Sequence, residues 1–144
     1  MLRFARSAPL AAASFAAAVL PAIPAHAAAP IAGRYLTQDG SGIVQIGPCG
    51  GSVCGRLVTI LRSTPGAAKT DVNNSDAALR SRPILGMPIL SNFTDSGKDW
   101  RGQIYDPRNG KTYKSIVTRN ADGSLNVKGC IAFFCQTQRW TPAR

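Results

Sequence analysis

The sequence predicts an all-β domain, a small antiparallel up-and-down β-barrel of about eight strands, with a β-sandwich as the alternative. From residue 33 onward, short runs of strand-forming residues are separated by Gly, Asn, Asp and Pro. The connections are mostly short, and there is neither a long amphipathic helix nor a regular alternation of strands and helices. Closing such a meander removes its unpaired edges and leaves an interior for packed side chains or one small ligand.

The expected strands follow one another at short intervals. They cover residues 33–37, 43–46, 53–61, 87–93, 100–105, 111–119, 125–131 and 133–141. The clearest alternation is in the seventh, where Leu125 and Val127 point one way and Asn126 and Lys128 the other. Hairpin turns are expected where Asp or Asn meets Gly, at residues 39–42, 106–110 and 120–123.

The first 27 residues have the three parts of a secretory signal peptide. A basic start with Arg3 and Arg6 precedes an apolar run over residues 10–20, and Ala25-x-Ala27 supplies a cleavage site. The apolar run is shorter than the ~20 residues that a membrane-spanning helix needs. We therefore expect cleavage after Ala27 and a single barrel domain over residues 28–144, exported to the periplasm or secreted, without a transmembrane segment.

Removal of the leader changes the composition. It takes Arg3 and Arg6 from the 17 basic residues and leaves 15 against seven acidic residues, a net charge of +8. The one histidine, His26, is also lost, and all seven acids are Asp, so the mature chain contains neither His nor Glu. Histidine-dependent nucleophiles and histidine zinc sites are thereby excluded. We expect no catalytic residue, metal or cofactor; a hydrolase centred on Asp71, Asp99 or Asp106 is the minor alternative.

Four cysteines form two C-x-x-x-x-C pairs, Cys49 with Cys54 and Cys130 with Cys135. In an exported protein, an even number of cysteines indicates disulfides, and a zinc site of four thiolates is the alternative. The sequence allows three connectivities. We predict the two local pairs, because each would close a short turn and fix its conformation.

The interval over residues 62–83 is too long for a hairpin. Connections above about 15 residues are uncommon and tend to be functional or mobile. Its second part carries Asp76-Ala-Ala-Leu79, which predicts one or two helical turns. The segment could form a lid over one barrel mouth, or a plug with Leu79 as its apolar foot.

Several motifs together resemble a known family. They are Cys49-Gly-Gly-Ser-Val-Cys54-Gly-Arg-Leu-Val, Asp71-x-Asn73-Asn74, Leu79-Arg-Ser-Arg-Pro-Ile-Leu-Gly86, the segment from Trp100 to Tyr113, and Gly129-Cys130 with Cys135-Gln-Thr-Gln-Arg-Trp140. In this order they resemble the bacterial exported domain-of-unknown-function family 2147. The resemblance implies a lipocalin-like β-barrel. Where such barrels often open with Gly-x-Trp, this chain has Gly33-Arg34-Tyr35, which keeps an aromatic residue at the barrel floor.

Four large aromatic residues lie in the predicted strands and are either core or the lining of an apolar ligand cavity: Trp100, Tyr105, Tyr113 and Trp140. Beside the last of them, Arg139 could stack its guanidinium on a ring and help to close the barrel.

The most suggestive polar residues are two arginines in an otherwise apolar motif. Arg80 and Arg82 could hold a carboxylate or phosphate, or could pair internally with Asp71 or Asp106. With Asn73, these aspartates are assigned structural polar roles.

Two functions remain after these exclusions. The first is a barrel that binds a small apolar or amphipathic ligand. The second is a ligand-free structural or interaction module whose basic face contacts anionic components of the cell envelope. Nucleic acid is not an expected partner, because the basic residues are scattered along the chain and form no aromatic-interleaved platform.

Overall fold

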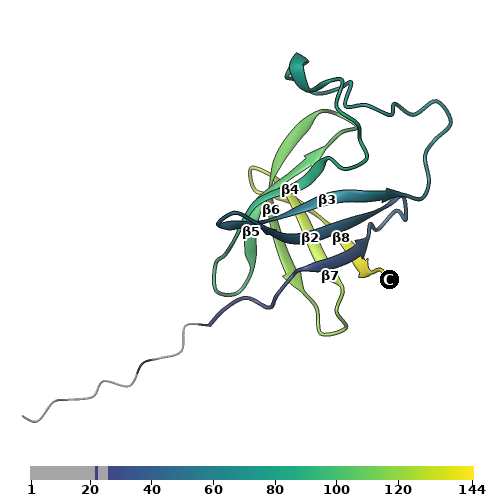
Figure 1. Ribbon diagram of the computed structural model, residues 1–144. Coiled ribbons are helices and arrows are strands. Elements are labelled where there is room, and N and C mark those ends of the chain that lie inside the picture. The colour runs from purple at the N-terminus through teal and green to yellow at the C-terminus, as the bar shows by residue number, and fades with distance from the viewer. Residues whose placement is uncertain (1–21, 23–25) are drawn as a thin grey trace, which may run out of the picture.

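The computed structural model describes residues 22 and 26–144, so most of the predicted signal peptide lies outside the described residues. The described chain forms eight strands that close into one barrel (Figure 1). They are β1 (Gly33–Leu36), β2 (Gly42–Cys49), β3 (Ser52–Ile60), β4 (Pro88–Asp95), β5 (Trp100–Asp106), β6 (Lys111–Arg119), β7 (Leu125–Ile131) and β8 (Phe134–Pro142). The predicted up-and-down barrel is confirmed, and the sandwich alternative is not adopted.

Every strand pairs antiparallel with the next, and β1 pairs with β8 to close the sheet through Tyr35 opposite Pro142 and Leu36 opposite Thr141. This order gives the barrel two ends. The entry end holds residues 28–32 before β1 and the β2–β3, β4–β5 and β6–β7 turns. The loop end holds the β1–β2, β5–β6 and β7–β8 turns and the long β3–β4 connection (Figure 1).

The core fills the barrel toward its entry end. Inward residues alternate along the strands, as with Val44 and Ile46 on β2 and Leu125 and Val127 on β7. Trp140, 1% exposed, is among the largest of these buried side chains. The buried cluster is Ile31, Tyr35, Val44, Ile46, Leu90, Phe93, Val117, Leu125, Val127 and Trp140. Tyr35 thus packs in the core as the aromatic residue expected near the barrel floor.

Strand β4 contains an irregularity that the sequence pattern does not reveal. Asn92 has a φ of 57°, and the β4–β5 register shifts between Ser91 and Thr94. Because of this bulge, Leu90 and Phe93 both face the core although they are three residues apart. Gly102 makes room for the ring, since a Cβ there would lie 2.6 Å from a ring carbon of Phe93.

Both cysteine pairs are local disulfides. Cys49 bonds Cys54 across the β2–β3 turn with a Cα–Cα distance of 5.9 Å, and Cys130 bonds Cys135 across the β7–β8 turn with 4.0 Å. This is the predicted connectivity. Each bond joins neighbouring strands, so each stabilises a turn at one end of the barrel rather than linking distant parts of the chain.

The long connection contains one short 3-10 helix, Ala77–Leu79, capped by Asp76, whose carboxylate accepts the backbone N–H of Ala78 at 3.0 Å. The predicted helical segment is thus a single turn. Leu79 is 38% exposed and does not act as a buried apolar foot. The connection is instead fastened by polar contacts to the outer face of β5. No helix among the described residues has the length and apolar character to cross a bilayer.

Candidate functional site

The β4–β5 turn holds one side of a hollow at the entry end. Asp99, which is buried, accepts hydrogen bonds from Arg101 Nε at 2.9 Å and from Ser96. The hydrogen bond from Arg101 is the main reason why the pKa of Asp99 lies below its ordinary value. Trp100 follows Asp99 at the start of β5, and its Nε1 donates to the backbone oxygen of Ala29 at 2.9 Å.

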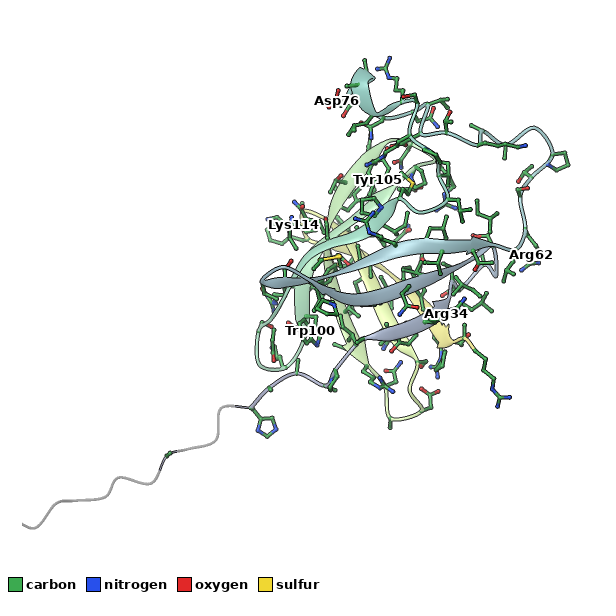
Figure 2. The ribbon with its side chains drawn as sticks, in the orientation of Figure 1. Arg34, Arg62, Asp76, Trp100, Tyr105 and Lys114 are labelled. Atoms are coloured by element: carbon green, nitrogen blue, oxygen red, sulfur yellow. A yellow bond between two sulfur atoms is a disulfide. The ribbon has the colours of Figure 1, made fainter. Side chains whose placement is uncertain are left out.

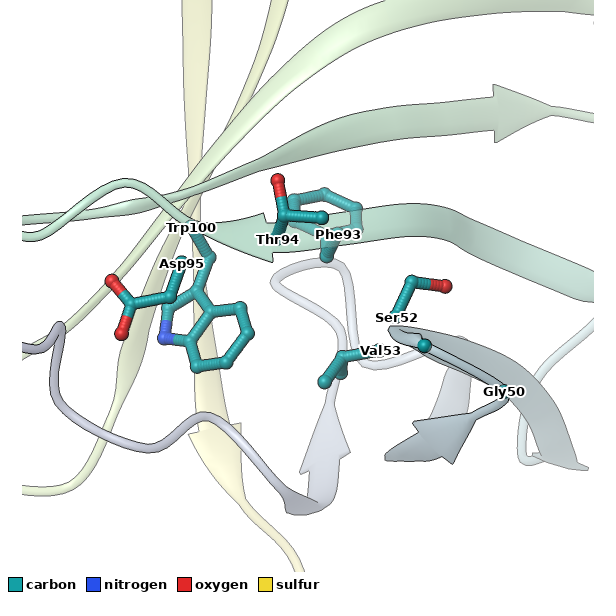
Figure 3. A pocket seen from close by; sticks show the side chains of 8 residues that line it. Gly50, Ser52, Val53, Phe93, Thr94, Asp95 and Trp100 are labelled. Carbon is teal, nitrogen blue, oxygen red and sulfur yellow. The ribbon is translucent and has the colours of Figure 1, made fainter.

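The hollow beside Trp100, called here the Trp100 hollow, has a volume of about 340 Å³ (Figure 3). Its apolar walls are Phe93, Val53 and Trp100, which come from three adjacent strands. Two glycines of the β2–β3 turn expose only backbone toward it. The lining residues are Gly50, Gly51, Ser52, Val53, Phe93, Thr94, Asp95 and Trp100. An apolar group would therefore contact three hydrophobic side chains, with polar groups close by.

Asp95 fixes the neighbouring N-terminal segment. Both of its carboxylate oxygens accept the backbone N–H of Ala28, at 3.0 and 3.1 Å, and one also accepts the N–H of Gly97 at 2.7 Å. Arg119 donates to the oxygen of Pro30 at 3.1 Å, and the next side chain, Ile31, is in the core. Residues 28–31 are thus attached to three strands at the entry end.

A buried carboxylate organises the long connection on the outer face of β5. Asp71 is fully buried and accepts hydrogen bonds from Tyr105 Oη at 2.6 Å, Asn74 Nδ2 at 2.7 Å and Arg82 Nε at 2.9 Å. Tyr105 follows Ile104, which is partly buried and packs against the core, so the alternation of the strand directs the Tyr105 ring outward. The Arg82 guanidinium lies 5.3 Å from the centre of that ring.

The environment keeps Asp71 ionised. Burial acts to raise the pKa of Asp71, but the hydrogen bonds from Tyr105, Asn74 and Arg82 outweigh it, and the pKa lies below its ordinary value. Burial, with the hydrogen bond to Asp71, raises the pKa of Tyr105. A carboxylate with a lowered pKa is poorly suited to act as a general acid near neutral pH.

A second hollow of about 260 Å³ lies beside this network and is lined by Asn74, Ser75, Leu79, Arg82, Pro88, Ser91, Gln103, Tyr105, Gly110 and Thr112. Both arginines of the predicted anion clamp already have internal partners. Arg82 binds Asp71, and Arg80 Nε donates to the backbone oxygen of Asn74 at 2.8 Å. The Arg82–Asp71 ion pair is therefore the internal pairing predicted from the sequence as the alternative to an anion clamp.

Asp106 and Asn73 both act at the β5–β6 turn. Asp106 pairs with Arg108 at 3.0 Å and not with Arg80 or Arg82. Asn73 Nδ2 donates to the backbone oxygens of Pro107 at 3.2 Å and Arg108 at 3.1 Å. The two contacts of Asn73 tie the long connection to the turn, whereas the Asp106–Arg108 pair lies within the turn.

The other predicted residues are dispersed. Trp140 is in the core, and its Nε1 donates to Gln138 Oε1 at 3.0 Å, whereas the Tyr113 hydroxyl accepts from Asn109 Nδ2 at 2.8 Å. The predicted stacking of Arg139 is replaced by an ion pair with Asp122. The four aromatic residues and two arginines therefore do not form one site.

The carboxylates of the hydrolase alternative also lie apart. Asp99 precedes β5 and Asp106 ends it, so the length of a seven-residue strand separates them. At ~3.3 Å per residue that is roughly 20 Å, well beyond the spacing of a glycosidase carboxylate pair. Sequence reasoning missed Asp95, whose partner Ala28 lies 67 residues away, and no local signal predicts such a contact.

The geometry defines a small up-and-down barrel with disulfide-closed turns at both ends and an apolar hollow at one of them. The chain belongs to the family described as "Uncharacterized protein conserved in bacteria (DUF2147)", which matches residues 33–142. Family membership and disulfides fit an exported bacterial protein.

The fold is similar to that of protein HP1028 from the human pathogen Helicobacter pylori, which is described as belonging to the lipocalin family. The two chains are 24% identical, with a TM-score of 0.70, over 80% of this chain and 84% of HP1028. The barrel is therefore lipocalin-like. A search of curated proteins found no match.

Proposed function

We propose that this protein is an exported binding protein, periplasmic or secreted, that holds the apolar part of a small apolar or amphipathic ligand in the Trp100 hollow. The observation that carries the proposal is the hollow itself, about 340 Å³ with walls of Phe93, Val53 and Trp100. Ligand pockets typically begin at about 300 Å³ and combine apolar walls with a few polar groups. The lipocalin-like fold also favours binding over catalysis.

The chemistry of the lining specifies the class of ligand. Phe93 is almost fully buried, while Trp100 and Val53 are half-buried, so an apolar group in the hollow would cover surface that water now contacts. Ser52 and Asp95 offer oxygen acceptors for a polar end. A ligand filling the barrel interior around Trp140 would have to displace packed core side chains.

Glycines of the β2–β3 hairpin provide a matched test. Gly51 lines the hollow, and a Cβ there would meet no atom within 4 Å, so Gly51→Leu adds an apolar side chain at the wall of the hollow with no clash at its Cβ. A Cβ at Gly47 on β2 would also meet nothing, and Gly47 does not line the hollow, so Gly47→Leu is the control.

The probes are an alkylammonium and a fatty acid of equal chain length, titrated while tryptophan fluorescence is recorded. Because Trp140 is buried, a ligand-induced change reports mainly on Trp100. We expect the wild type and Gly47→Leu to bind alike. Gly51→Leu should bind at least about tenfold more weakly, because the ligand then buries less apolar surface in the hollow. Equal affinities for all three proteins would refute the site. Comparing the two probes shows which head group the rim prefers.

Native mass spectrometry of the protein purified from an exporting host supplies the second arm. A bound amphiphile on the wild type and Gly47→Leu, absent from Gly51→Leu, is the expected result. A ligand retained by all three would place the binding elsewhere in the barrel.

The alternative, a ligand-free module with a basic face toward anionic envelope components, also has a specific observation in its favour. Strands β6, β7 and β8 contain five basic residues and no acidic one: Lys111, Lys114, Arg119, Lys128 and Arg139. This function predicts binding to an anionic polymer that weakens steeply with salt and does not change in Gly51→Leu.

A further inference from the structure

The β7–β8 turn carries the most exposed apolar side chains of the described residues. Phe133 is 99% exposed, Phe134 84% and Ile131 65%, whereas no other large apolar side chain among these residues exceeds 53%. Scattered exposed apolar residues are normal on a protein surface, but adjacent and almost fully exposed phenylalanines mark an interaction site.

The turn is held in this exposed form. The Cys130–Cys135 disulfide closes it immediately behind the apolar residues, and Ile131 pairs with Phe134 across it. Ala132 adopts a φ of 51°, the left-handed conformation that reverses the chain within this short turn. With its ends joined, the turn cannot easily fold back to bury the two rings against the barrel.

Unpaired lysines lie directly behind the apolar residues. Lys114 is opposite Cys130 in the β6–β7 ladder, beside the turn in Figure 2, and Lys128 precedes Cys130 by two residues on the same face of β7. Neither lysine forms an ion pair within residues 26–144. Asp106, at the same end of the barrel, is already paired with Arg108.

We propose that the β7–β8 turn is a membrane-docking element that inserts its two phenylalanines into the surface of an anionic lipid bilayer. Aromatic rings at a bilayer surface bury in the boundary between head groups and acyl chains, and adjacent lysines bind anionic head groups. The lysines favour this partner over a second copy of the chain, because two copies meeting at this turn would bring like charges together.

The docking element is separate from the Trp100 hollow. Trp100 pairs with Val117, and Val117 pairs with Val127. The β7–β8 turn follows Ile131, four residues further along β7, at the loop end. A docked barrel therefore leaves the hollow at the end away from the lipid, and loss of either activity is measurable without loss of the other.

The test uses protein from an exporting host, with its N-terminus and both disulfides verified by mass spectrometry so that no leader contributes. Co-sedimentation compares vesicles of phosphatidylcholine with vesicles containing phosphatidylglycerol. We expect binding to the anionic vesicles, reduced at least about tenfold in the double variant Phe133→Ser, Phe134→Ser. Leu85→Ser, which removes an exposed apolar side chain from the long connection, should bind as the wild type does.

The charge contribution has its own matched control. Lys114→Ala and Lys128→Ala should each weaken binding about fivefold, as expected for about 1 kcal/mol per basic residue near an anionic surface. Lys98→Ala has the same net charge, but Lys98 lies in the β4–β5 turn at the entry end, so binding should change little. Equal effects of all three substitutions would indicate a diffuse charge attraction and overturn the proposed orientation.

Insertion is read separately with Phe133→Trp. Its fluorescence should shift to shorter wavelength on anionic vesicles and be quenched by brominated acyl chains. Absence of vesicle binding, or binding that does not depend on the phenylalanines, would overturn the proposal. Self-association that depends on them, seen by sedimentation velocity without lipid binding, would assign the turn to a second copy and also overturn it. Circular dichroism of each variant verifies that the barrel is intact.

Discussion

Replacing Asp71 by Ala tests the buried network that fastens the long connection. The substitution removes the acceptor shared by Tyr105, Asn74 and Arg82. Hydrogen bonds to a charged group contribute about 1.5–3 kcal/mol each, and breaking a buried ion pair costs about 3–5 kcal/mol. Because the Arg82 side chain is 27% exposed and can be rehydrated, we expect the lower part of that range, about 3 kcal/mol.

Urea unfolding measures this cost through the midpoint and the slope of the transition. The pH dependence supplies a second readout, because the hydrogen bonds from Tyr105, Asn74 and Arg82 outweigh the effect of burial and lower the pKa of Asp71 in the folded protein. Its contribution is present above the unfolded aspartate pKa of about 4 and is lost as the pH falls through the folded pKa. The stability difference between wild type and variant should therefore be constant near neutral pH and shrink in acid.

The isosteric Asp71→Asn variant separates charge from shape. Its amide keeps one oxygen acceptor but places a donor among the donors of Asn74 and Arg82. We expect a loss at neutral pH smaller than that of the Ala variant. Its deficit relative to the wild type should also shrink between about pH 5 and 3, because the wild type then loses the charge that Asn lacks. If Asp71→Ala costs less than about 1 kcal/mol, or if its stability deficit is the same at pH 3 as at pH 7, the assigned role of the network is wrong.

Three further predictions concern single contacts. Gly102→Ala should lower stability by about 1–3 kcal/mol in thermal unfolding, because its Cβ would lie 2.6 Å from a ring carbon of Phe93 and 2.6 Å from the backbone oxygen of Ser91; Phe93→Leu in the same chain should recover part of the loss. A chain beginning at Ala28 should be more stable than one with an extra preceding residue, by about 1 kcal/mol, since its charged amine would face the Asp95 carboxylate; Asp95→Asn should abolish the difference. Reduction confined to the Cys130–Cys135 bond should increase amide exchange in the β7–β8 turn while leaving β2 to β6 protected, because the bond closes a short loop.

Much of the fold could be predicted because its signals are local. Alternation identifies β7, where Leu125 and Val127 face the core and Lys128 faces outward, and the turn residues locate the hairpins. The local cysteine spacing likewise led to the two turn-closing disulfides. The bulge at Asn92 breaks the two-residue period, so the pattern did not show that Leu90 and Phe93 share the interior.

The candidate sites were harder to predict because their partners are distant in the chain. Tyr105 reaches Asp71 over 34 residues, and Asp95 reaches Ala28 over 67. Trp100 and Trp140 are both strand residues with an arginine next to them, yet one lines a hollow and the other fills the core. Their difference depends on strand register and on how the β2–β3 and β4–β5 turns meet, which alternation alone does not determine.

The two proposed activities place opposite demands on the two disulfides. At the entry end, the Cys49–Cys54 bond closes the turn that supplies Gly50 and Gly51 to the hollow, so it shapes a space. The Cys130–Cys135 bond closes the turn that carries Phe133, so it keeps this apolar side chain exposed although its contact with water is unfavourable. Because each bond acts on one hairpin, selective reduction of Cys49–Cys54 should impair ligand binding alone, and selective reduction of Cys130–Cys135 should impair membrane docking alone. Loss of both activities after reduction of a single bond would show that the two ends are coupled through the barrel.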